Sequence, residues 1–259
     1  MEKKKGISGS TLKMIAIVTM LIDHIGAAVL ARLLMVNGLG ELDQTNTDAI
    51  MQWLSANGAL YGTYTVMRMI GRVAFPIFCF LLVEGFLHTH DVKKYVLRLG
   101  LFALISEIPF DLAFSSKILE FNYQNVFFTL FIGLLTMIAY RAVEEKEEWN
   151  QALKVILYIL IVAAGMALAY FLKTDYAEKG VFCIMVLYIF RKKKMWQIIA
   201  GCASFIWETP ALFGFIPIAF YNGTRGWKMK YFFYIFYPAH LLILYLLCYF
   251  MGISGYSAV

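Results

Sequence analysis

The sequence predicts an all-α protein, a polytopic transmembrane helical bundle of about nine spans with its N-terminus in the cytoplasm. Of its 259 residues, 61% are apolar and only 15% are charged, whereas about a quarter of the residues in a typical soluble domain are charged. Apolar stretches long enough to cross a bilayer core of roughly 30 Å recur along the whole chain. Clusters rich in lysine and arginine separate them and fall mainly on one side.

The expected spans follow one another through short connections. The first is a retained helix rather than a cleaved signal peptide, because Asp23 and His24 interrupt its apolar run. The segments at 178–190, 195–208 and 210–221 are short for a full crossing, so we expect them to be tilted, broken or re-entrant and the count to lie between about eight and ten. We expect spans at residues 12–36, 60–88, 95–115, 124–142, 152–172, 178–190, 195–208, 210–221 and 231–251.

The connections between the spans predict their orientation. The longest, at about 37–59, is mildly acidic and is expected outside. The outer side otherwise holds mainly Lys117, Lys173 and Lys179, which puts the N-terminus inside and, with nine spans, the C-terminus outside. The basic residues of the opposite, cytoplasmic side are Lys3, Lys4, Lys5, Lys93, Lys94, Arg98, Arg141, Lys146, Arg191, Lys192, Lys193, Lys194, Arg225, Lys228 and Lys230.

Composition narrows the function classes. The formal charge of +6 follows from the basic cytoplasmic loops, and no basic patch with interleaved aromatics indicates nucleic acid. The four cysteines stand singly in apolar runs, which is typical of packing residues. No repeat or linker divides the chain, so residues 1–259 are expected to form a single membrane domain in contact with the lipid bilayer. The oligomeric state stays open, a homo-oligomer included.

Ionisable residues inside the spans predict a polar cavity. A charged side chain at bilayer depth costs about 2.5 to 3.5 kcal/mol on insertion scales, so each needs a partner or a function. The sequence has too many for a simple anchor. They are Asp23, His24, Arg68, Arg72, Glu84, Glu107, Asp111, Glu208 and His240.

His24 is the principal catalytic candidate. Lys13 and His24 are eleven residues apart, which places them on nearly the same helix face with a rise of about 16 Å. Desolvation favours the neutral imidazole, which can accept a proton as a general base. The alternative is a histidine that only hydrogen-bonds a neighbouring helix. Asp23 points elsewhere on the helix and either orients a polar partner or pairs with an arginine.

Arg68 and Arg72 are spaced i,i+4, so their guanidinium groups face the same way and need an anion between them. In a structural interpretation, Glu107 and Asp111 supply it in a four-charge cluster. In a functional one, the arginines bind a phosphate or stabilise developing charge on a thioester oxygen. Pro76 and Pro109, inside the second and third spans, are expected to bend the helices beside this cluster.

Two further groups of ionisable residues lie at the ends of expected spans. Glu84 and His88, with His90 and Asp91, have the residue types of a metal site, but interfacial polar residues commonly end a span, and no metal is predicted. His240 begins the last span and is either interfacial or catalytic.

Several strings resemble the TraX family across nearly the whole chain. The family is named for a conjugative-plasmid membrane protein linked to N-acetylation of the pilin subunit, and the resemblance implies acetyl transfer more firmly than it implies pilin. It also implies a bacterial cytoplasmic (inner) membrane location. The strings are Leu12-Lys13 through Ile22-Asp23-His24-Ile25-Gly26, Gly71 to Phe78 continuing to Glu84-Gly85, Ser106 to Asp111, Gln124 to Thr129, Tyr221-Asn222-Gly223, Lys230 to Tyr234, and Tyr237 to His240.

A more distant similarity points to membrane acyltransferases that O-acetylate cell-surface glycans. Lys13 and His24 match their pattern of a basic residue, ten residues and a histidine, although the basic residue there is more often arginine. Arg68 and Arg72 depart from their closer arginine pair by one residue. His24 is therefore the best match, and the transfer of arginine roles is in doubt.

These resemblances imply an acetyl-CoA-dependent acyltransferase with an unknown acceptor that carries an amine or a hydroxyl. His24 is the expected base or acetyl carrier, with Asp23, Arg68 and Arg72 beside it. The expected binding residues for CoA are Lys13, Arg68, Arg72, Lys93, Lys94 and Arg98, together with the cluster Arg191 to Lys194, and the supporting residues are Glu84, Glu107, Asp111, Asn125 and His240.

Three alternatives stay open. A secondary transporter would also bury charges near the midplane, and a nonenzymatic assembly protein would not need them. Among enzymes, an intramembrane O-acyltransferase would use a histidine and an asparagine, with His240 and Asn125 or Asn222 as candidates.

Overall fold

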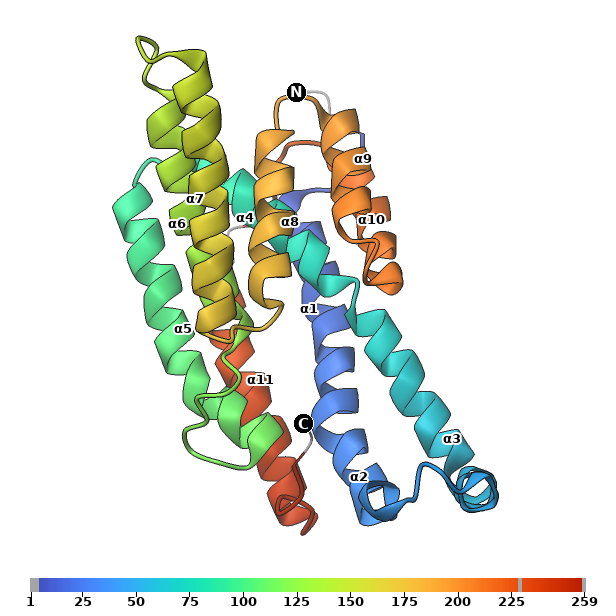
Figure 1. Cartoon of the computed structure of the whole chain (residues 1–259). Coiled ribbons are helices and arrows are strands. Elements are labelled where there is room, and N and C mark those ends of the chain that lie inside the picture. Colours follow the sequence, from blue (N-terminus) through green and yellow to red (C-terminus); the bar gives the residue numbers. More distant parts are fainter. Residues whose placement is uncertain (1–4, 228–229, 258–259) are drawn as a thin grey trace.

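The computed structural model describes residues 5–227 and 230–257, and within these ranges the chain is helical with two isolated bridges, Ile7 to Tyr221 and Gln124 to Thr174 (Figure 1). The expected all-α fold is confirmed. Lys3, Lys4 and Lys228, which belong to the predicted cytoplasmic cluster, lie outside the described residues.

The first apolar segment is one rod of 28 residues, Gly9–Val36. It comprises α1 (Gly9–Ile25), a π-helical turn η1 (Gly26–Leu30) and α2 (Ala31–Val36). Ser8 caps α1 by accepting from the backbone N–H of Thr11. The π turn begins two residues after His24, and such turns frequently occur at functional sites.

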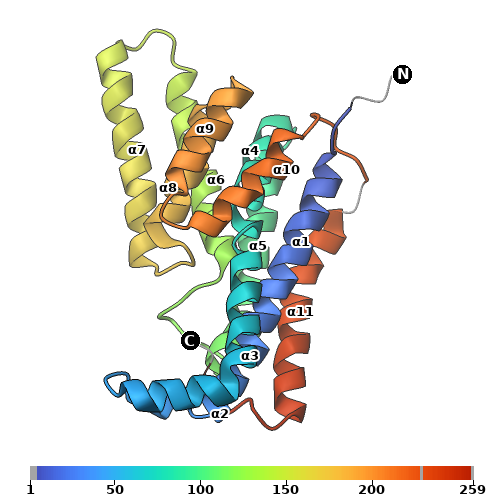
Figure 2. The same cartoon turned by 90° about the vertical axis from the view of Figure 1, so that its right-hand side faces the viewer.

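The second apolar segment contains two helices, α3 (Thr47–Gly71) and α4 (Ala74–His88), after the short 3-10 turn η2 (Leu39–Glu41). Figure 2 shows the start of α3 lying across the bottom of the molecule before the helix turns upward. Pro76 lies in the first turn of α4, where its missing N–H costs little, so the chain breaks at Arg72 and Val73 rather than bending at Pro76. Pro109 lies inside α5, as expected.

The remaining helices complete the bundle. Asp91, Asn125 and Asn150 cap three of them through side-chain oxygens. The elements are α5 (Val92–Ser115), α6 (Val126–Glu144), α7 (Gln151–Phe171), α8 (Ala177–Ile189), α9 (Lys194–Ser204), the 3-10 turn η3 (Thr209–Gly214), α10 (Phe215–Ala219) and α11 (Lys230–Phe250).

Within the described residues, five segments are long and apolar enough to span a membrane, fewer than the nine expected. They are Gly9–Val36, Thr47–His88, Val126–Glu144, Gln151–Phe171 and Tyr231–Phe250. The α8 helix has 13 residues and α9 has 11, which at 1.5 Å per residue gives about 20 Å and 17 Å, too short for a core of roughly 30 Å. The expected spans at 178–190, 195–208 and 210–221 are therefore too short for a straight crossing, as their lengths in the sequence suggest. The expected span at 95–115 is also not among the five segments, because Arg98, Glu107 and Asp111 interrupt its apolar run.

Two buried clusters hold the bundle together. One lies around α4, α6 and α8 and includes Phe80, Met185 and Tyr188. The other joins α1, α5 and α11 through side chains such as Ile17 and Leu241. By contrast, only 11% of the most apolar window of α7 is buried, so this helix presents its side chains to the surroundings, as a lipid-facing helix does.

Candidate functional site

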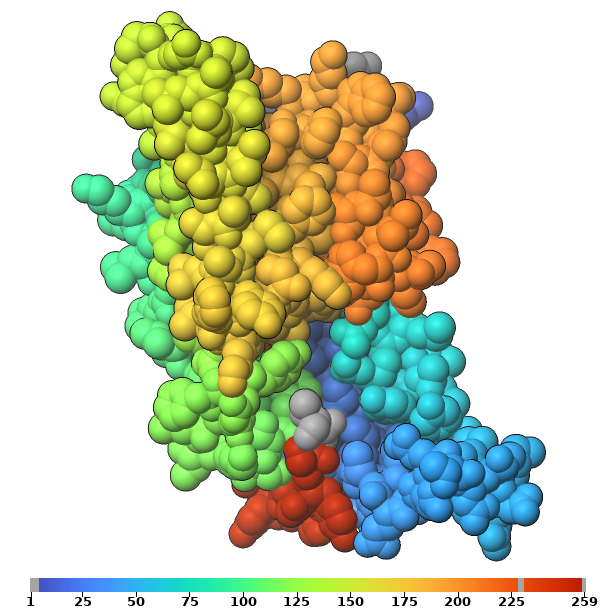
Figure 3. Space-filling view, in the orientation of Figure 1, coloured from blue at the N-terminus to red at the C-terminus, as the bar shows by residue number. Residues whose placement is uncertain are grey.

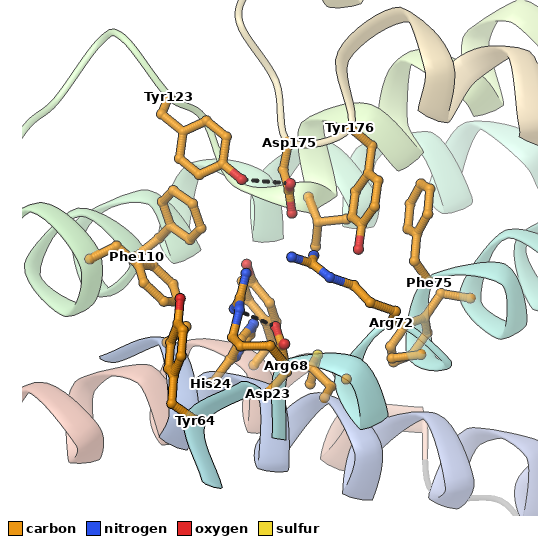
Figure 4. A pocket seen from close by; sticks show the side chains of 18 residues that line it. Asp23, His24, Tyr64, Arg68, Arg72, Phe75, Phe110, Tyr123, Asp175 and Tyr176 are labelled. Carbon is orange, nitrogen blue, oxygen red and sulfur yellow. Dashed lines mark hydrogen bonds and ion pairs between the residues drawn. The ribbon is translucent and has the colours of Figure 1, made fainter. Parts of the chain in front are cut away.

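A cavity of about 110 Å³ lies where the two clusters meet, lined by α1, α3, α4, α5 and the connections around residues 123 and 175 (Figure 4). Met20 and Phe110 of the second cluster form part of its wall, and Phe75 of the first cluster forms another part. Asp23, His24, Arg68 and Arg72, which the sequence predicts as catalytic, all line it. The structure thus brings these four residues together around one cavity.

His24 heads a short chain of hydrogen bonds. Its Nδ1 lies 2.6 Å from Nε2 of His240, and Nδ1 of His240 lies 2.7 Å from the carbonyl oxygen of Phe236. A carbonyl oxygen only accepts, so Nδ1 of His240 donates to it; in a neutral ring Nε2 of His240 then accepts, and Nδ1 of His24 donates. The lone pair of a neutral His24 is therefore on Nε2.

The packing around the two imidazoles fixes their orientation. The rings of His24 and His240 are nearly parallel, with an interplanar angle of 3° and centroids 4.9 Å apart. Phe114 and Tyr237 approach His24 edge-on. Because aromatic side chains hold the ring from several directions, its Nε2 has little freedom to turn away.

Arg68 pairs with Asp23 across the α1–α3 contact, with 3.0 Å between Nη1 and Oδ2 (Figure 4). Of the two roles that the sequence allows for Asp23, the structure shows the ion pair with an arginine. The two helices approach closely here: a Cβ added to Gly71 would lie only 2.1 Å from the Cβ of Asp23. Only glycine leaves room for the carboxylate at this point.

Arg72 forms its ion pair with a different carboxylate. Its Nε lies 3.0 Å from Oε1 of Glu208, which follows α9, and its guanidinium also interacts with the hydroxyl of Tyr176. Since Asp23 and Glu208 each take one guanidinium, the like charges spaced i,i+4 are neutralised separately.

The predicted four-charge cluster of Arg68, Arg72, Glu107 and Asp111 is wrong. Glu107 instead accepts from the side-chain amide of Asn125, and Asp111 accepts from the backbone N–H of Glu120 at 2.8 Å. Both carboxylates thus hold the loop before α6, Asp111 through the backbone N–H of Glu120 and Glu107 through Asn125. Neither lines the cavity.

The α7–α8 connection contributes residues that sequence reasoning missed. Asp175 accepts from the hydroxyl of Tyr123 at 2.7 Å, and Tyr176 stacks on Phe75 with centroids 3.7 Å apart. Lys173, Tyr176 and Ala177 all have positive φ, a left-handed conformation that residues other than glycine rarely adopt. Backbone strain of this kind clusters at functional sites, but it leaves no recognisable motif in the sequence.

Asp175 lies outside the candidate spans. Burial raises the pKa of its carboxyl above the ordinary range, while the hydrogen bond from Tyr123 and the charges of Arg72 and Arg68 lower it in part. The ionisation of Asp175 therefore depends on its burial and on the two guanidinium groups of the cavity.

The other predicted binding and supporting residues lie away from the cavity. The ammonium of Lys13 lies 5.1 Å from the ring centroid of Phe233, and Lys94 pairs with Asp91. Arg98 lies over the ring of Tyr95. Eight of the predicted residues do not line the cavity: Lys13, Lys93, Lys94, Arg98, Glu84, Glu107, Asp111 and Asn125. His240, also expected as a supporting residue, reaches the site through His24.

In the described part of the chain, no group of three or more histidine, cysteine, aspartate or glutamate residues could hold a metal ion. Among the described residues, Glu84 and His88 are joined by a hydrogen bond from the His88 ring to the Glu84 carbonyl oxygen, 2.8 Å away, which is a helix-end contact.

Comparisons with known proteins identify a family that this chain matches. Residues 8–248 match the family described as TraX protein. The chain is 26% identical to a protein of Dichelobacter nodosus named "Probable fimbrial assembly protein FimC, serogroup H1", over 94% of this chain and 97% of that one. No solved structure matches the chain.

Proposed function

This chain belongs to the TraX family, and from that membership and the geometry of the cavity we propose that it is a membrane-embedded acetyltransferase. In this proposal, acetyl-CoA is the donor, and a membrane-proximal or extracytoplasmic amine or hydroxyl is the acceptor. The protein lies in the bacterial cytoplasmic membrane with its N-terminus inside. A likeness to a fimbrial assembly protein supports a pilus-like peptide as one acceptor class.

The arrangement of His24 is the observation that carries the proposal. The hydrogen bonds from Phe236 through His240 place the lone pair of a neutral His24 on Nε2, and His24 lines a cavity of about 110 Å³, large enough for an acetyl group. This is the arrangement of an oriented general base, in which a second group fixes the tautomer.

The reaction then balances as follows. The acceptor oxygen or nitrogen attacks the carbonyl carbon of the thioester while its proton passes to Nε2 of His24. The tetrahedral oxyanion collapses, the carbon–sulfur bond breaks, and the CoA sulfur leaves with the proton that His24 returns. In the other course, Nε2 attacks the thioester carbonyl carbon, the carbon–sulfur bond breaks and CoA leaves as the thiolate. The acceptor then attacks the acetyl group on Nε2, the nitrogen–carbon bond breaks, and the acceptor proton passes to the CoA thiolate.

The two arginines supply charge for the oxyanion. A guanidinium has five N–H donors, and the ion pairs of Arg68 and Arg72 with Asp23 and Glu208 use only part of them. Donors held in place before the reaction stabilise a developing negative charge by about 2.7 to 4 kcal/mol each. Asp23 acts here as a positioning residue that holds Arg68 beside His24.

The basic residues near the first turns of α1 and α5 support a donor that arrives from the cytoplasm. Lys13, Lys93, Lys94 and Arg98 lie there, and phosphate groups of CoA need such partners. Lys13 shares a helix face with His24 at a rise of about 16 Å. The nucleotide would then stay at the membrane surface while the thioester reaches the cavity.

Binding and turnover of acetyl-CoA test the proposal. We expect detergent-purified protein to bind acetyl-CoA and release free CoA thiol, and His24→Ala to bind it while releasing thiol about 10²- to 10⁴-fold more slowly. The matched control is His90→Ala, because His90 is exposed and lies outside the cavity. Binding without histidine-dependent release would remove His24 from the chemistry.

A nonenzymatic assembly role is the second candidate, favoured by the name of the Dichelobacter nodosus relative. The measurement that separates the two is acetyl-CoA binding itself. If the protein binds no acetyl-CoA, although its thermal unfolding transition shows that it is folded, the result would support an assembly role and end the acetyltransferase proposal.

A further inference from the structure

A second groove adjoins the candidate site. It has a volume of about 420 Å³ and is formed by the α7–α8 connection, the loop before α6 and Trp207. Tyr123 and Tyr176 line both the groove and the cavity. Figure 3 shows this face of the molecule hollowed beside the α7–α8 connection and the green segment before α6. The shared tyrosines are thus the partition between the two spaces.

The partition is held firmly from the cavity side. Tyr123 donates to Asp175, and Tyr176 stacks on Phe75 and interacts with Arg72. A ligand bound in the groove would therefore have one end against side chains that directly contact the charged residues of the site.

Two lysines give the groove its charge. Lys173 donates to the amide oxygen of Asn122 at 2.7 Å, and the ammonium of Lys179 lies 5.0 Å from the ring centroid of Trp207. Of the carboxylates that the structure describes, none forms an ion pair with either lysine. Glu178 also lines the groove, so its three charged side chains carry a net charge of one positive unit.

These two lysines are exceptions to the expected charge distribution, in which most basic residues lie on the cytoplasmic side. Under the proposed orientation the outer side has few basic residues, mainly Lys117, Lys173 and Lys179. Lys117 is neutralised by Glu120, three residues away. The other two both line the groove, beside an aromatic surface formed by Trp207 and Tyr170. Unpaired cations next to aromatic rings are suited to a ligand with an oxyanion group and an apolar or sugar-like body.

We infer that this groove is the acceptor site and binds a phosphate-bearing acceptor, whose phosphate lies between Lys173 and Lys179. The hydroxyl or amine to be acetylated then passes between Tyr123 and Tyr176 toward His24. The binding part stands on the groove alone, and the second part rests on the proposed function. The phosphate belongs either to a soluble acceptor or to a lipid headgroup, since both offer the same chemistry.

Calorimetric titration of the full-length purified protein with glycerol 3-phosphate tests this, with glycerol as the uncharged counterpart. We expect saturable binding of the phosphate ester and none of glycerol. Lys173→Gln combined with Lys179→Gln should weaken binding at least about tenfold, the loss of roughly one charged hydrogen bond. Glu178→Gln should tighten it, and Lys117→Gln, which changes a paired lysine outside the groove, should leave it unchanged.

Equal binding of glycerol and its phosphate, or equal weakening by Lys117→Gln and by the double variant, would overturn the inference. His24→Ala should bind glycerol 3-phosphate as the wild type does, so failure of the acetyltransferase proposal and failure of this one are distinguishable. Competition with short-chain phosphatidylglycerol and with the corresponding phosphate-free diacylglycerol separates the two sources. Displacement of glycerol 3-phosphate by phosphatidylglycerol alone indicates a lipid headgroup as the natural source, and displacement by neither lipid indicates a soluble acceptor.

Discussion

Replacing Gly71 with alanine should damage the candidate site without removing any of its functional groups. The added Cβ would lie 2.1 Å from Cβ of Asp23 and 2.3 Å from its Cγ and Oδ1. Ordinary carbon contacts are about 3.5 to 4.0 Å, so α1 and α3 must separate by about 1.5 Å or Asp23 must turn away. Either movement breaks the 3.0 Å ion pair with Arg68.

The size of the effect follows from overpacking and misplacement. Overpacking a close contact costs about 1 to 3 kcal/mol, which lowers the melting temperature of a chain of this length by roughly 2 to 12 °C. A displacement of about 1 Å near the reacting groups costs about 10²-fold in rate. We therefore expect Gly71→Ala to be folded, moderately destabilised and nearly inactive in CoA thiol release.

Gly62→Ala is the matched control, because it lies in the same helix and a Cβ there meets nothing within 4 Å. Thermal denaturation and thiol release of the two variants should be measured in the same detergent. The control should match or exceed the wild type in stability, since alanine favours a helix by about 0.5 to 1 kcal/mol over glycine. If Gly71→Ala behaves like Gly62→Ala in both assays, the close α1–α3 approach does not matter.

Three further predictions concern residues around the site. His240→Phe should keep the packing on Phe236 but remove the hydrogen bond that fixes the tautomer of His24. We expect kcat for thiol release to fall by about tenfold to 10⁴-fold with KM for acetyl-CoA unchanged, and an unchanged kcat would contradict the hydrogen-bond chain. Arg32 is fully buried and donates to backbone oxygens of α5 and of Tyr256, so Arg32→Met should destabilise the protein by about 2 kcal/mol or more, and an unchanged melting temperature would refute this. Burial raises the pKa of Asp175 in the folded state, so above the ordinary pKa of about 3.9 the folded protein binds more protons than the unfolded chain. The wild type should therefore lose stability relative to Asp175→Asn as the pH rises from about 3.9 to the pKa of the folded state. A constant difference in melting temperature between pH 4 and 8 would contradict this prediction.

The sequence predicts those parts of the site that depend on local helix geometry. Hydropathy and composition identify the helical membrane fold. The i,i+4 spacing places Arg68 and Arg72 on one wall of the cavity, and the isolated imidazole of His24 proves to line it. Each of these expectations needs only the rise and turn of a single helix.

The partners of these residues could not be predicted, because they are set by tertiary packing. His24 and His240 are 216 residues apart, and their contact depends on how α11 packs against α1. Asp23 and Glu208, rather than Glu107 and Asp111, neutralise the arginines, and spacing along one helix cannot distinguish between the two pairs. The expected span count is too high for a similar reason, since α8 is apolar because it is buried among other helices.

Chemical rescue of His24→Ala by imidazole is the measurement that tests the central claim most directly. Thiol release from acetyl-CoA by this variant should be slow, and added imidazole should restore part of it above a protein-free control, because the small base can occupy the space left at the cavity. His90→Ala should show no dependence on imidazole. Full activity of His24→Ala without imidazole would contradict the account, because no proton acceptor would then be needed at that position.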